Sequence, residues 1–336
     1  MGDNVTAVGK EAAAPPTGRA AADIVIVNWN SGDWLRRCVA SIAEHGAGRV
    51  GGVTVVDNGS VDGSDRLDVP GLPLKVVRTG ANLGFGRACN LGARRGRSSY
   101  ILFLNPDAAL LPGTLDKVVG FLDRPENAGV GVCGVKLIEE DGAVQRHCAR
   151  LPGPATFLAA ASGLAALFPS RLPTLHERGF DHLSSQVVDH VIGAFYLIRR
   201  DLFEALGGFD ERFFVYLEDL DLSARVRQAG YQVFYLADAA GLHQGGGTSE
   251  QVKPQRLAYS LESRITYAFK HFPAPAALAV AAATLMGEPL PRLARALAHR
   301  SGAEARDTLR GFGLLWRRMA SRAVGHSRSA QAGELR

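Results

Sequence analysis

Short apolar runs alternate with amphipathic stretches through the first third of the chain. Residues 86–95 and the stretch that follows Ser31 place apolar side chains at helical spacing. Four short runs are mainly apolar, the first of them rich in β-branched residues, and have the length of buried strands: residues 23–29, 53–57, 74–78 and 100–105. Strands that alternate with helices at this pitch form βαβ units. The pattern therefore predicts an α/β fold with a Rossmann-like, mostly parallel central sheet flanked by helices.

The pattern changes in the middle of the chain. Residues 152–173 are apolar and rich in Ala, Leu and Pro, and two interpretations stay open: a helix packed in the core, or an acceptor-side flap. From Val252 onward the chain is expected to be helical, with basic and apolar faces. Further elements are predicted here: strands over 130–137, 187–199 and 231–236, and a helix over 217–229 that Gly230 ends.

Composition limits the classes of partner. The 336 residues are 46% hydrophobic, which supports a packed core. The net charge is +5, and ten Arg but only four acids follow from Glu288 to the end. Such a basic segment favours an anionic surface, such as a membrane face, over nucleic acid. The longest apolar stretch, residues 274–286, contains Pro275 and is shorter than the roughly 18 residues that span a bilayer.

The start of the chain and the cysteines bear on localisation. The first 22 residues are rich in Ala, Gly and Pro and lack the apolar core of a secretion signal, so we expect a disordered lead. The cysteines show no metal-binding spacing and are expected to be reduced thiols: Cys38, Cys89, Cys133 and Cys148. These features predict a cytoplasmic protein, with peripheral contact at the inner membrane face as a further hypothesis.

Polar side chains follow the ends of predicted strands. Asp57 ends the second strand, and Asn105 and Asp107 end the fourth in the segment LNPDAAL. In an open α/β sheet, groups at the carboxyl ends of strands meet in one crevice. Oxygen ligands there suit Mg²⁺ or Mn²⁺, which keeps substrate phosphate oxygens in its shell. The alternatives are an Asx turn at Asp57 and a Pro turn with an Asp cap at Asp107.

The segment ANLGFGRACNLGARRG carries two asparagines, Asn82 and Asn90, among several glycines. The glycines would let a ligand approach the backbone, and the asparagines could bind a base or a sugar. The alternative is a glycine-lined turn followed by a helix that packs on the sheet. A GxGxxG motif after the first strand is missing from the sequence, so a dinucleotide site is poorly supported.

A later acidic cluster contains Glu218, Asp219 and Asp221 at the start of a predicted helix. The helix dipole favours acids in a first turn, so a purely structural role is possible. The apolar residues 213–216 precede the cluster, and burial beside them would raise the pKa of one acid towards that of a general base. His243 follows a strand in a glycine-rich loop, which favours a ligand role, although a lone histidine is more often structural.

Taken together, six segments in this order resemble the family 2 glycosyltransferases of the GT-A fold. The resemblance is strongest to bacterial rhamnosyltransferase-like members that act on lipid-linked or cell-envelope acceptors, and it spans Ile24 to Gly247. It divides the chain into the lead (1–22), a GT-A domain (23–250, with a nucleotide half over about 23–110 and an acceptor half over about 111–250) and a basic helical extension (251–336). The segments are VIVNWNS, DNGSVDGS, NLGFGRACNLG, LNPD, GGFDERFFVYLEDLDLSAR and LHQGGGTS.

The resemblance implies roles on the donor side. Asp57 matches the position that binds the nucleotide base, and Trp29 stands where many relatives have Tyr and borders the base. The remaining donor-side positions match the NxGxxxxxN segment: Asn82, Gly84 and Asn90.

The resemblance also implies a metal site and a base. Asp107 matches the last Asp of the D-x-D metal motif, whose first Asp is replaced here by Asn105. His243 matches a late histidine that ligates the metal in several members. Asp219, with Glu218 before it, matches the ED motif that supplies the catalytic base.

The implied reaction is inverting transfer of a sugar, with dTDP-rhamnose as the favoured donor, to a hydroxyl of a lipid-linked or polysaccharide acceptor, assisted by Mg²⁺ or Mn²⁺. Two other functions stay open. A sugar-1-phosphate nucleotidyltransferase would need a Gly-rich, Lys- or Arg-bearing signature after the first strand, which NWNSGDW does not supply. A non-catalytic nucleotide-sugar or carbohydrate-binding protein would not need Asp219. The sequence does not predict the oligomeric state.

Overall fold

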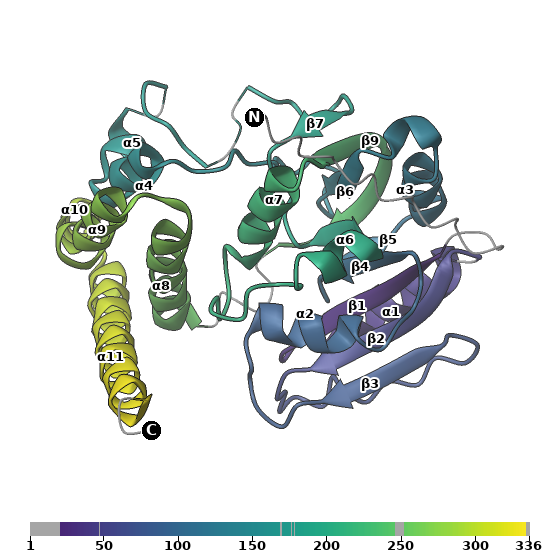
Figure 1. Cartoon of the computed structure of the whole chain (residues 1–336), viewed down its shortest axis with the longest axis horizontal. Helices are drawn as coiled ribbons and strands as arrows, with labels where there is room; N and C mark the ends of the chain where they lie inside the picture. The colour runs from purple at the N-terminus through teal and green to yellow at the C-terminus, as the bar shows by residue number, and fades with distance from the viewer. Residues whose placement is uncertain are drawn as a thin grey trace, which may run out of the picture.

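A twisted mixed sheet forms the centre of the molecule, and helices cover both of its faces (Figure 1). The computed structural model describes residues 21–333, except 47, 169, 176, 178 and 246–251, and side chains only as far as residue 322. Within these residues the strands pair in the order β3-β2-β1-β4-β8-β6-β9-β5, and β7 adds to β9. Most of the predicted lead, residues 1–20, lies outside the described part of the chain.

The first half of the sheet follows the sequence prediction. β1 pairs in parallel with both β2 and β4, and β2 pairs in parallel with β3. The bounds of these strands are Ala22–Asn28 (β1), Val50–Asp57 (β2), Leu74–Arg78 (β3) and Tyr100–Leu104 (β4). Helices α1 (Asp33–His45) and α2 (Phe85–Ala93) lie in the connections. The four strands therefore carry their carboxyl ends to one edge of the sheet.

The direction of the chain reverses at β8 (Phe195–Arg199), which pairs antiparallel with β4 and places Phe195 opposite Leu104. The start of β8 therefore lies at the edge where β4 ends. The predicted strand over 187–199 is wrong in its centre, because β7 and β8 are separated by residues 189–194. The other strands of this half are β5 (Ala108–Leu110), β6 (Val130–Ile138), β7 (Gln186–Val188) and β9 (Gln232–His243).

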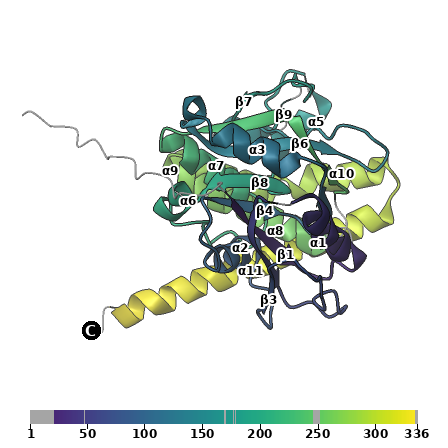
Figure 2. The same ribbon diagram turned by 90° about the vertical axis from the view of Figure 1, so that its right-hand side faces the viewer.

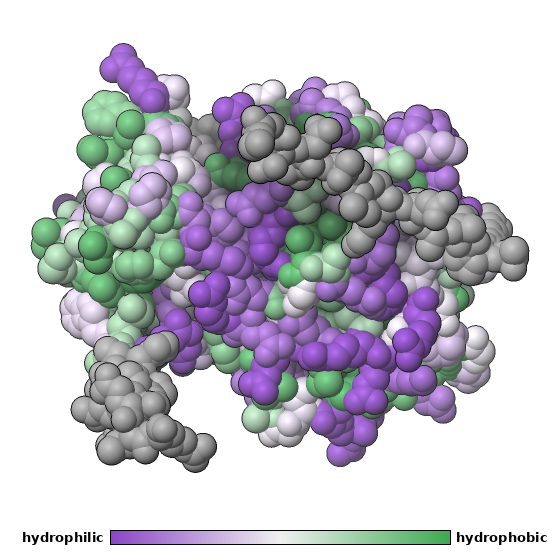
Figure 3. Space-filling view, in the orientation of Figure 1, coloured by the Kyte–Doolittle hydropathy of each residue, from purple (hydrophilic) through white to green (hydrophobic). Residues whose placement is uncertain are grey.

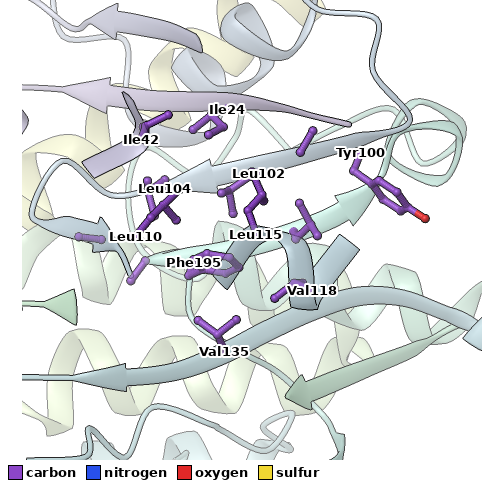
Figure 4. Packing of buried hydrophobic residues seen from close by; sticks show 14 of the residues in the cluster. Ile24, Ile42, Tyr100, Leu102, Leu104, Leu110, Leu115, Val118, Val135 and Phe195 are labelled. Carbon is purple, nitrogen blue, oxygen red and sulfur yellow. The ribbon is translucent and has the colours of Figure 1, made fainter. Parts of the chain in front are cut away.

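Each face of the sheet has its own apolar core. One core packs α1 and α3 (Thr114–Leu122) against side chains such as Ile24, Leu102 and Phe195 (Figure 4). The other packs α2, α6 (Arg200–Ala205) and α7 (Glu218–Gln228) on the opposite face. Complete burial of one such aliphatic side chain stabilises the fold by about 1.5–3 kcal/mol. A single-turn helix, Pro125–Asn127, precedes β6.

The C-terminal quarter forms a helical group beside α7, as predicted from the pattern after Val252 (Figure 1). α11 continues away from the body of the molecule (Figure 2). The group contains α8 (Lys253–His271), α9 (Ala274–Ala282), a π-helical turn (Ala283–Gly287), α10 (Pro289–Ala298) and α11 (Gly302–Gly333). Within the described residues, none of the helices combines the length and apolar character that crossing a membrane requires.

The apolar segment 152–173 joins this helical group. α4 (Pro154–Ala161) buries Phe157 against Tyr267 and Phe272, so its helix is packed in the core. The short α5 (Leu164–Leu167) that follows has no buried residue. Of the two interpretations drawn from the sequence, core packing therefore holds for α4, and α5 lies at the surface.

Several of the C-terminal arginines bind buried acids inside the protein. Glu262 accepts a hydrogen bond from Arg318 at 2.6 Å, and Glu288 pairs with Arg264 and Arg292. Both carboxylates are almost fully buried. A buried carboxylate that loses its partner is strongly destabilising. Part of the positive charge that the sequence analysis assigned to an external anionic surface therefore stabilises helix packing instead.

Candidate functional site

The predicted site residues at strand ends come to one edge of the sheet. Asn28 and Asp57, the last residues of β1 and β2, are direct partners in the register of the two strands. Asn105 follows β4, and its backbone N–H donates to the carbonyl of Ala194, just before β8, at 3.0 Å. The edge at which an α/β sheet is expected to bind its ligand thus carries residues at the ends of β1, β2 and β4 and at the start of β8.

Asp57 is held by a neighbour that the sequence analysis did not select. Asn28 Nδ2 donates to Asp57 Oδ1 at 2.9 Å, and the backbone N–H of Ser60 donates to Oδ2 at 3.3 Å. Asn28 is fully buried, and it also contacts the hydroxyl groups of Ser60 and Ser64. Asp57 therefore has a fixed orientation, and the Asx-turn contact coexists with its place at the strand end. Trp29, the next residue after Asn28, is half-buried.

The turn before α2 is fixed by two asparagine side chains. Asn82 Oδ1 accepts from Asn58 Nδ2 and from the backbone N–H of Gly84, each at 3.0 Å. Gly84 has φ of +87°, and a Cβ atom there would lie 2.3 Å from the carbonyl oxygen of Phe214. That oxygen accepts the backbone N–H of Phe85 at 2.7 Å. Gly84 is therefore required by the close approach of the loop that precedes α7.

Asn90 connects α2 to the same loop. Its Nδ2 donates to the carbonyl of Phe209 at 2.9 Å and to Glu211 Oε1 at 3.1 Å, and its Oδ1 accepts the N–H of Phe209 at 2.8 Å. The carboxamide is buried and engaged by protein atoms on both sides. Its contacts stabilise the loop that carries the acidic cluster.

Asp107 and His243 come together through strand pairing. β5 pairs antiparallel with β9 and places Ala108 opposite His243, so the residue before Ala108 faces the end of β9. His243 Nε2 lies 3.5 Å from Asp107 Oδ1, and both side chains are largely buried. Asn105, the position of the missing first Asp, lies two residues earlier and is half-exposed.

Gln145, which the sequence analysis missed, orients the histidine. Gln145 Oε1 lies 2.7 Å from His243 Nδ1, and its Nε2 donates to Glu139 Oε1 at 3.5 Å. Since the amide nitrogen faces a carboxylate, the amide oxygen faces Nδ1, which must carry the proton. In that tautomer Nε2 presents a lone pair towards Asp107.

A lone pair and a carboxylate repel each other unless a cation lies between them, so this pair fits a divalent metal ion. A ring N–H bound to an acceptor is also the usual support for a metal-bound histidine. Among the described residues no cluster of three or more His, Cys, Asp or Glu side chains could hold a metal. Two protein ligands suit an ion whose remaining ligands are phosphate oxygens and water.

Asp219 lies at the start of α7 and is anchored to the same edge. Its Oδ2 accepts the backbone N–H of Gly193, and its Oδ1 accepts that of Leu220, each at 2.8 Å. Gly193 precedes Ala194, the residue that bonds to Asn105. The segment between β7 and β8, where the sequence predicted continuous strand, therefore brings Asp219 to the carboxyl end of β4.

Glu218 and Asp219 are neighbours with different surroundings. Burial, followed by the charges of Asp219 and Asp221, raises the pKa of Glu218 well above its ordinary value. Its Oε2 has no hydrogen-bond partner among the described residues. The side chain of Asp219 is 20% exposed. The pair therefore combines a buried carboxylic acid with an accessible carboxylate, the arrangement in which the second group can act as a base.

Asp221 has a structural environment. It is fully buried and binds Arg225 at 2.9 Å and both Lys270 and His271 at 2.7 Å. Burial opposes ionisation, but the hydrogen bonds from His271 and Lys270 and the charge of Arg225 outweigh it and lower the pKa of Asp221. This acid joins α7 to α8 and has no surface left for a substrate.

A family model described as Glycosyl transferase family 2 matches residues 23–207, more than half of the 336 residues. The chain is a family 2 glycosyltransferase. The sequence-based identification of the family and of the enzyme class is thereby confirmed. The match includes the strand-end residues Asp57 and Asp107 but ends before α7, so Asp219 and His243 lie outside it.

Curated relatives of this glycosyltransferase include two bacterial rhamnosyltransferases. An N-acetylglucosaminyl-diphospho-decaprenol L-rhamnosyltransferase from Mycobacterium tuberculosis is 30% identical over 260 residues, which cover 73% of this chain and 82% of the relative. Rhamnosyltransferase WbbL from Escherichia coli is 25% identical over 199 residues, which cover 56% of this chain and 71% of the relative.

Solved structures confirm the GT-A architecture. Mannosyltransferase PcManGT from Pyrobaculum calidifontis, in complex with GDP-Man and Mn²⁺, has a TM-score of 0.50 at 20% identity and covers 87% of this glycosyltransferase and 78% of its own chain. GalNAc-T7 with UDP, GalNAc and Mn²⁺ has a TM-score of 0.51 at 14% identity, over 76% of this chain and 51% of that one. At these identities the likeness concerns the fold alone.

Proposed function

We propose that this glycosyltransferase transfers a sugar from a nucleotide diphosphate donor with inversion, and that Asp219 is the general base. One observation carries the proposal. Asp219 is anchored to Gly193, and through Ala194 that segment is bonded to Asn105, two residues from Asp107. A carboxylate with access to solvent thus shares a sheet edge with the Asp107–His243 pair, which supports a base close to the donor's diphosphate.

On the donor side, Asp57 is the proposed ligand of the nucleotide base, with Trp29 beside it. Asn28 fixes the carboxylate of Asp57 before any ligand arrives, which reduces the ordering cost of binding. Asn82 and Gly84 support the site by shaping the turn before α2, and Asn90 supports it by holding the loop before α7; in this proposal their hydrogen bonds are made within the protein and not to the nucleotide sugar.

Asp107 and His243 are the proposed protein ligands of Mg²⁺ or Mn²⁺, with Asn105 beside them. When bound, the ion supplies positive charge against the diphosphate as negative charge grows on it. Asp107 and His243 would hold the ion, and Gln145 keeps the proton of His243 on Nδ1. Asp219 takes the proton of the acceptor hydroxyl, whose oxygen attacks the anomeric carbon from the face opposite the leaving group. The buried Glu218 stays protonated, so it does not compete with Asp219 for the proton of the acceptor hydroxyl.

The donor sugar is proposed from the relatives alone. Because the two relatives described above are rhamnosyltransferases, we propose L-rhamnose from dTDP-rhamnose as the sugar, and a lipid-linked or polysaccharide hydroxyl as the acceptor. Donor choice can depend on one hydroxyl group, so a panel of nucleotide sugars is the direct test. Release of free nucleoside diphosphate should be highest with dTDP-rhamnose and should require Mg²⁺ or Mn²⁺.

The role of Asp219 is tested by Asp219→Asn in the same assay. Loss of a general base should lower kcat by about 10²- to 10⁴-fold while the Kd for dTDP stays unchanged. Asp238→Asn, an equivalent change at an exposed position on β9, is the matched control and should keep full activity. Turnover of the Asp219 variant at the control's rate would remove this residue from the base role and would favour a non-catalytic binding protein.

We also propose that the enzyme works at the cytoplasmic face of a membrane, through an apolar patch that includes the first helix of the basic C-terminal segment. The patch consists of exposed side chains on α5, α9, the π-helical turn and α10, and Figure 3 shows apolar residues gathered over this part of the surface. Its members are Leu164, Leu167, Phe168, Leu278, Met286, Leu290 and Leu297. A Cβ atom on Gly163 would lie 2.8 Å from Pro291, which shows that the starts of α5 and α10 adjoin.

The chemistry of α10 favours a lipid surface as the occupant of the patch. Leu290 and Leu297 are 70% and 76% exposed, seven residues apart, and therefore lie on one helix face. Arg295 and Arg300 are exposed nearby and make no ion pair within the described part of the chain. Leucines on one face, with arginines on the polar side and beyond the helix end, are typical of helices that lie in the interface of an anionic bilayer.

Vesicle binding tests the patch. The double variant Leu290→Ser and Leu297→Ser should co-sediment less with phosphatidylglycerol vesicles than the wild-type protein does. The wild-type protein itself should bind only weakly to phosphatidylcholine vesicles. The matched control changes two exposed apolar residues elsewhere, Val61→Ser with Leu183→Ser. Equal binding by both double variants would contradict the patch, and loss of a dimer in light scattering without loss of vesicle binding would assign it to a second copy of the chain.

A further inference from the structure

A buried chain of polar groups leads from the core to Asp219, and neither the sequence motifs nor the proposed mechanism uses it. Tyr196 Oη lies 3.1 Å from Ser223 Oγ, which lies 2.9 Å from His190 Nδ1. The other ring nitrogen, Nε2, lies 3.7 Å from Asp219 Oδ2. Tyr196, Ser223 and His190 are almost fully buried. The residues come from β8, α7 and the segment between β7 and β8.

The direction of the hydrogen bonds follows from the donors available. Burial raises the pKa of Tyr196, so its hydroxyl keeps its proton, and Ser223 Oγ is its one hydrogen-bond partner in the described structure. If Ser223 donated to Tyr196, the phenolic proton would be buried without an acceptor, which costs about 1–3 kcal/mol. Tyr196 therefore donates to Ser223, and Ser223 donates to His190 Nδ1.

This direction determines the tautomer of His190. Nδ1 accepts, so Nε2 carries the proton and directs it towards the carboxylate of Asp219. The reversed chain would place a lone pair against that carboxylate, which is unfavourable. Burial lowers the pKa of His190 despite the opposing charges of Asp219 and Asp189, so the ring is neutral. The distance of 3.7 Å is longer than a hydrogen bond, as catalytic contacts often are before substrate binds.

The other charged and titratable groups around these hydrogen-bonded residues are neutral or already paired. Asp219 is therefore the carboxylate towards which His190 Nε2 can direct its proton. Glu218 is buried and its pKa is raised, and burial also raises the pKa of Cys89 well above its ordinary value, so both are neutral. Asp221 is balanced by Arg225, Lys270 and His271. Asp189 lies at the outer end of the segment, where it binds Arg227 at 3.1 Å.

We propose that His190 is a positioning residue for the base: its Nε2–H, with the backbone N–H of Gly193, holds the carboxylate of Asp219 in the orientation that aims it at the acceptor hydroxyl. Ser223 and Tyr196 fix the tautomer that makes this possible. The inference rests on the base role proposed for Asp219. The proposal also explains the interruption between β7 and β8. A continuous strand would not bring the N–H groups of both His190 and Gly193 to the carboxylate of Asp219.

Two substitutions of His190 separate this role from simple packing. In His190→Gln the amide nitrogen occupies the place of Nε2 and keeps a donor for Asp219. In His190→Asn the shorter side chain reaches only the place of Nδ1 and leaves Asp219 without that donor. We measure kcat/KM against pH with dTDP-rhamnose, or with the donor that the panel selects, together with the Kd for dTDP and the melting temperature.

We expect the acid limb of the His190→Asn profile to move up by about one pH unit, because loss of a donor favours the protonated carboxyl. The His190→Gln profile should stay within a few tenths of a unit of wild type. Tyr196→Phe should move the acid limb in the same direction by a smaller amount. Without the phenol, Ser223 no longer has to donate to His190 Nδ1, so His190 is free to adopt the other tautomer. The Kd for dTDP should be unchanged in all three variants.

The outcomes distinguish this inference from the role of Asp219 itself. If Asp219→Asn is inactive and His190→Asn keeps the wild-type pH profile, the positioning role is wrong and the base role stands. If Asp219→Asn is active, the base role is wrong. A His190→Asn protein that fails to fold leaves the decision to Tyr196→Phe and His190→Gln, where a shift in His190→Gln equal to or larger than that in Tyr196→Phe would overturn the proposal.

Discussion

Asp107 and His243 face each other across the β5–β9 pair, with His243 Nε2 3.5 Å from Asp107 Oδ1, although 136 positions separate them in the sequence. Main-chain pairing of Ala108 with His243 fixes this distance, so the two side chains are in place before any ligand binds. An arrangement of this kind lowers the ordering cost of capturing a cation.

The orientation of His243 can be tested through Gln145. Gln145→Ala removes the acceptor for Nδ1, so the imidazole is free to choose the other tautomer or to rotate, and affinity for Mn²⁺ should fall about 10- to 100-fold. Isothermal titration of Mn²⁺ in the presence of dTDP measures the change. Gln228→Ala at the exposed end of α7 is the control and should bind as wild type does. Unchanged affinity in Gln145→Ala would contradict the role of the amide.

The raised pKa of Glu218 predicts how stability depends on pH. A buried carboxyl whose pKa rises on folding binds more protons in the folded state, so the free energy of unfolding decreases as pH rises above about 4.5, the ordinary value. Glu218→Gln lacks this ionisation. The melting temperature of Glu218→Gln minus that of wild type should therefore increase as the pH is raised from 4.5 to 8. A constant difference across that range would show that Glu218 is not protonated in the fold.

Lys270 should be important for stability but not for chemistry. It binds both Asp210 and the fully buried Asp221, so Lys270→Met leaves two carboxylates with fewer partners and should destabilise the protein by about 3 kcal/mol. Urea unfolding measures the loss, and Lys75→Met on the exposed side of β3 is the control.

The same interaction has a pH signature. The pKa of Asp221 is lowered in the folded protein, so its contribution is present above about 3.8, the ordinary value, and is lost as pH falls through the folded value. The difference between wild type and Lys270→Met should accordingly shrink in acid. A gap that persists at the lowest pH at which both proteins fold would indicate lost packing and not lost charge.

Gly84 offers a test of close backbone approach. Gly84→Ala places a Cβ atom 2.3 Å from the Phe214 oxygen and forces a side chain into a left-handed conformation. Gly80→Ala shares the second problem, with φ of +74°, but has open space around its Cβ atom. The left-handed conformation alone costs roughly 1–2 kcal/mol. We expect Gly80→Ala to lose only that much stability, and Gly84→Ala to lose more and to raise the KM for the donor.

Most of the sheet and one edge of the site could be predicted from the sequence, because they depend on local order. Short apolar runs determine β1, β2 and β4, and Asp57 at the end of β2 and Asp107 just after β4 reach the same edge because these strands are parallel. The late positions Asp219 and His243 came from resemblance, and the structure brings them to that edge through Gly193 and the β5–β9 pair.

What the sequence did not reveal depends on contacts between distant residues. Asn28 and Gln145 hold site residues that lie 29 and 98 positions away, and nothing local distinguishes them from other amides. His190 was hidden because residues 187–199 have the apolar composition of one strand, whereas the fold interrupts it to accommodate α7. The many arginines of the last helices indicated a basic extension. That several of them pair with the buried Glu262 and Glu288 could be known only from the packing of the helices.

Phe214 joins two parts of the enzyme that are far apart in sequence. Its carbonyl oxygen holds the N–H of Phe85 beside the Gly84 turn, while its ring packs on Tyr259 beneath the guanidinium of Arg318 on α11. Truncation before α11 would therefore disturb the Gly84 turn as well as the helices. A loss of turnover in such a shortened protein could not be attributed to weaker membrane binding alone. Single-residue changes in full-length protein keep the two effects apart.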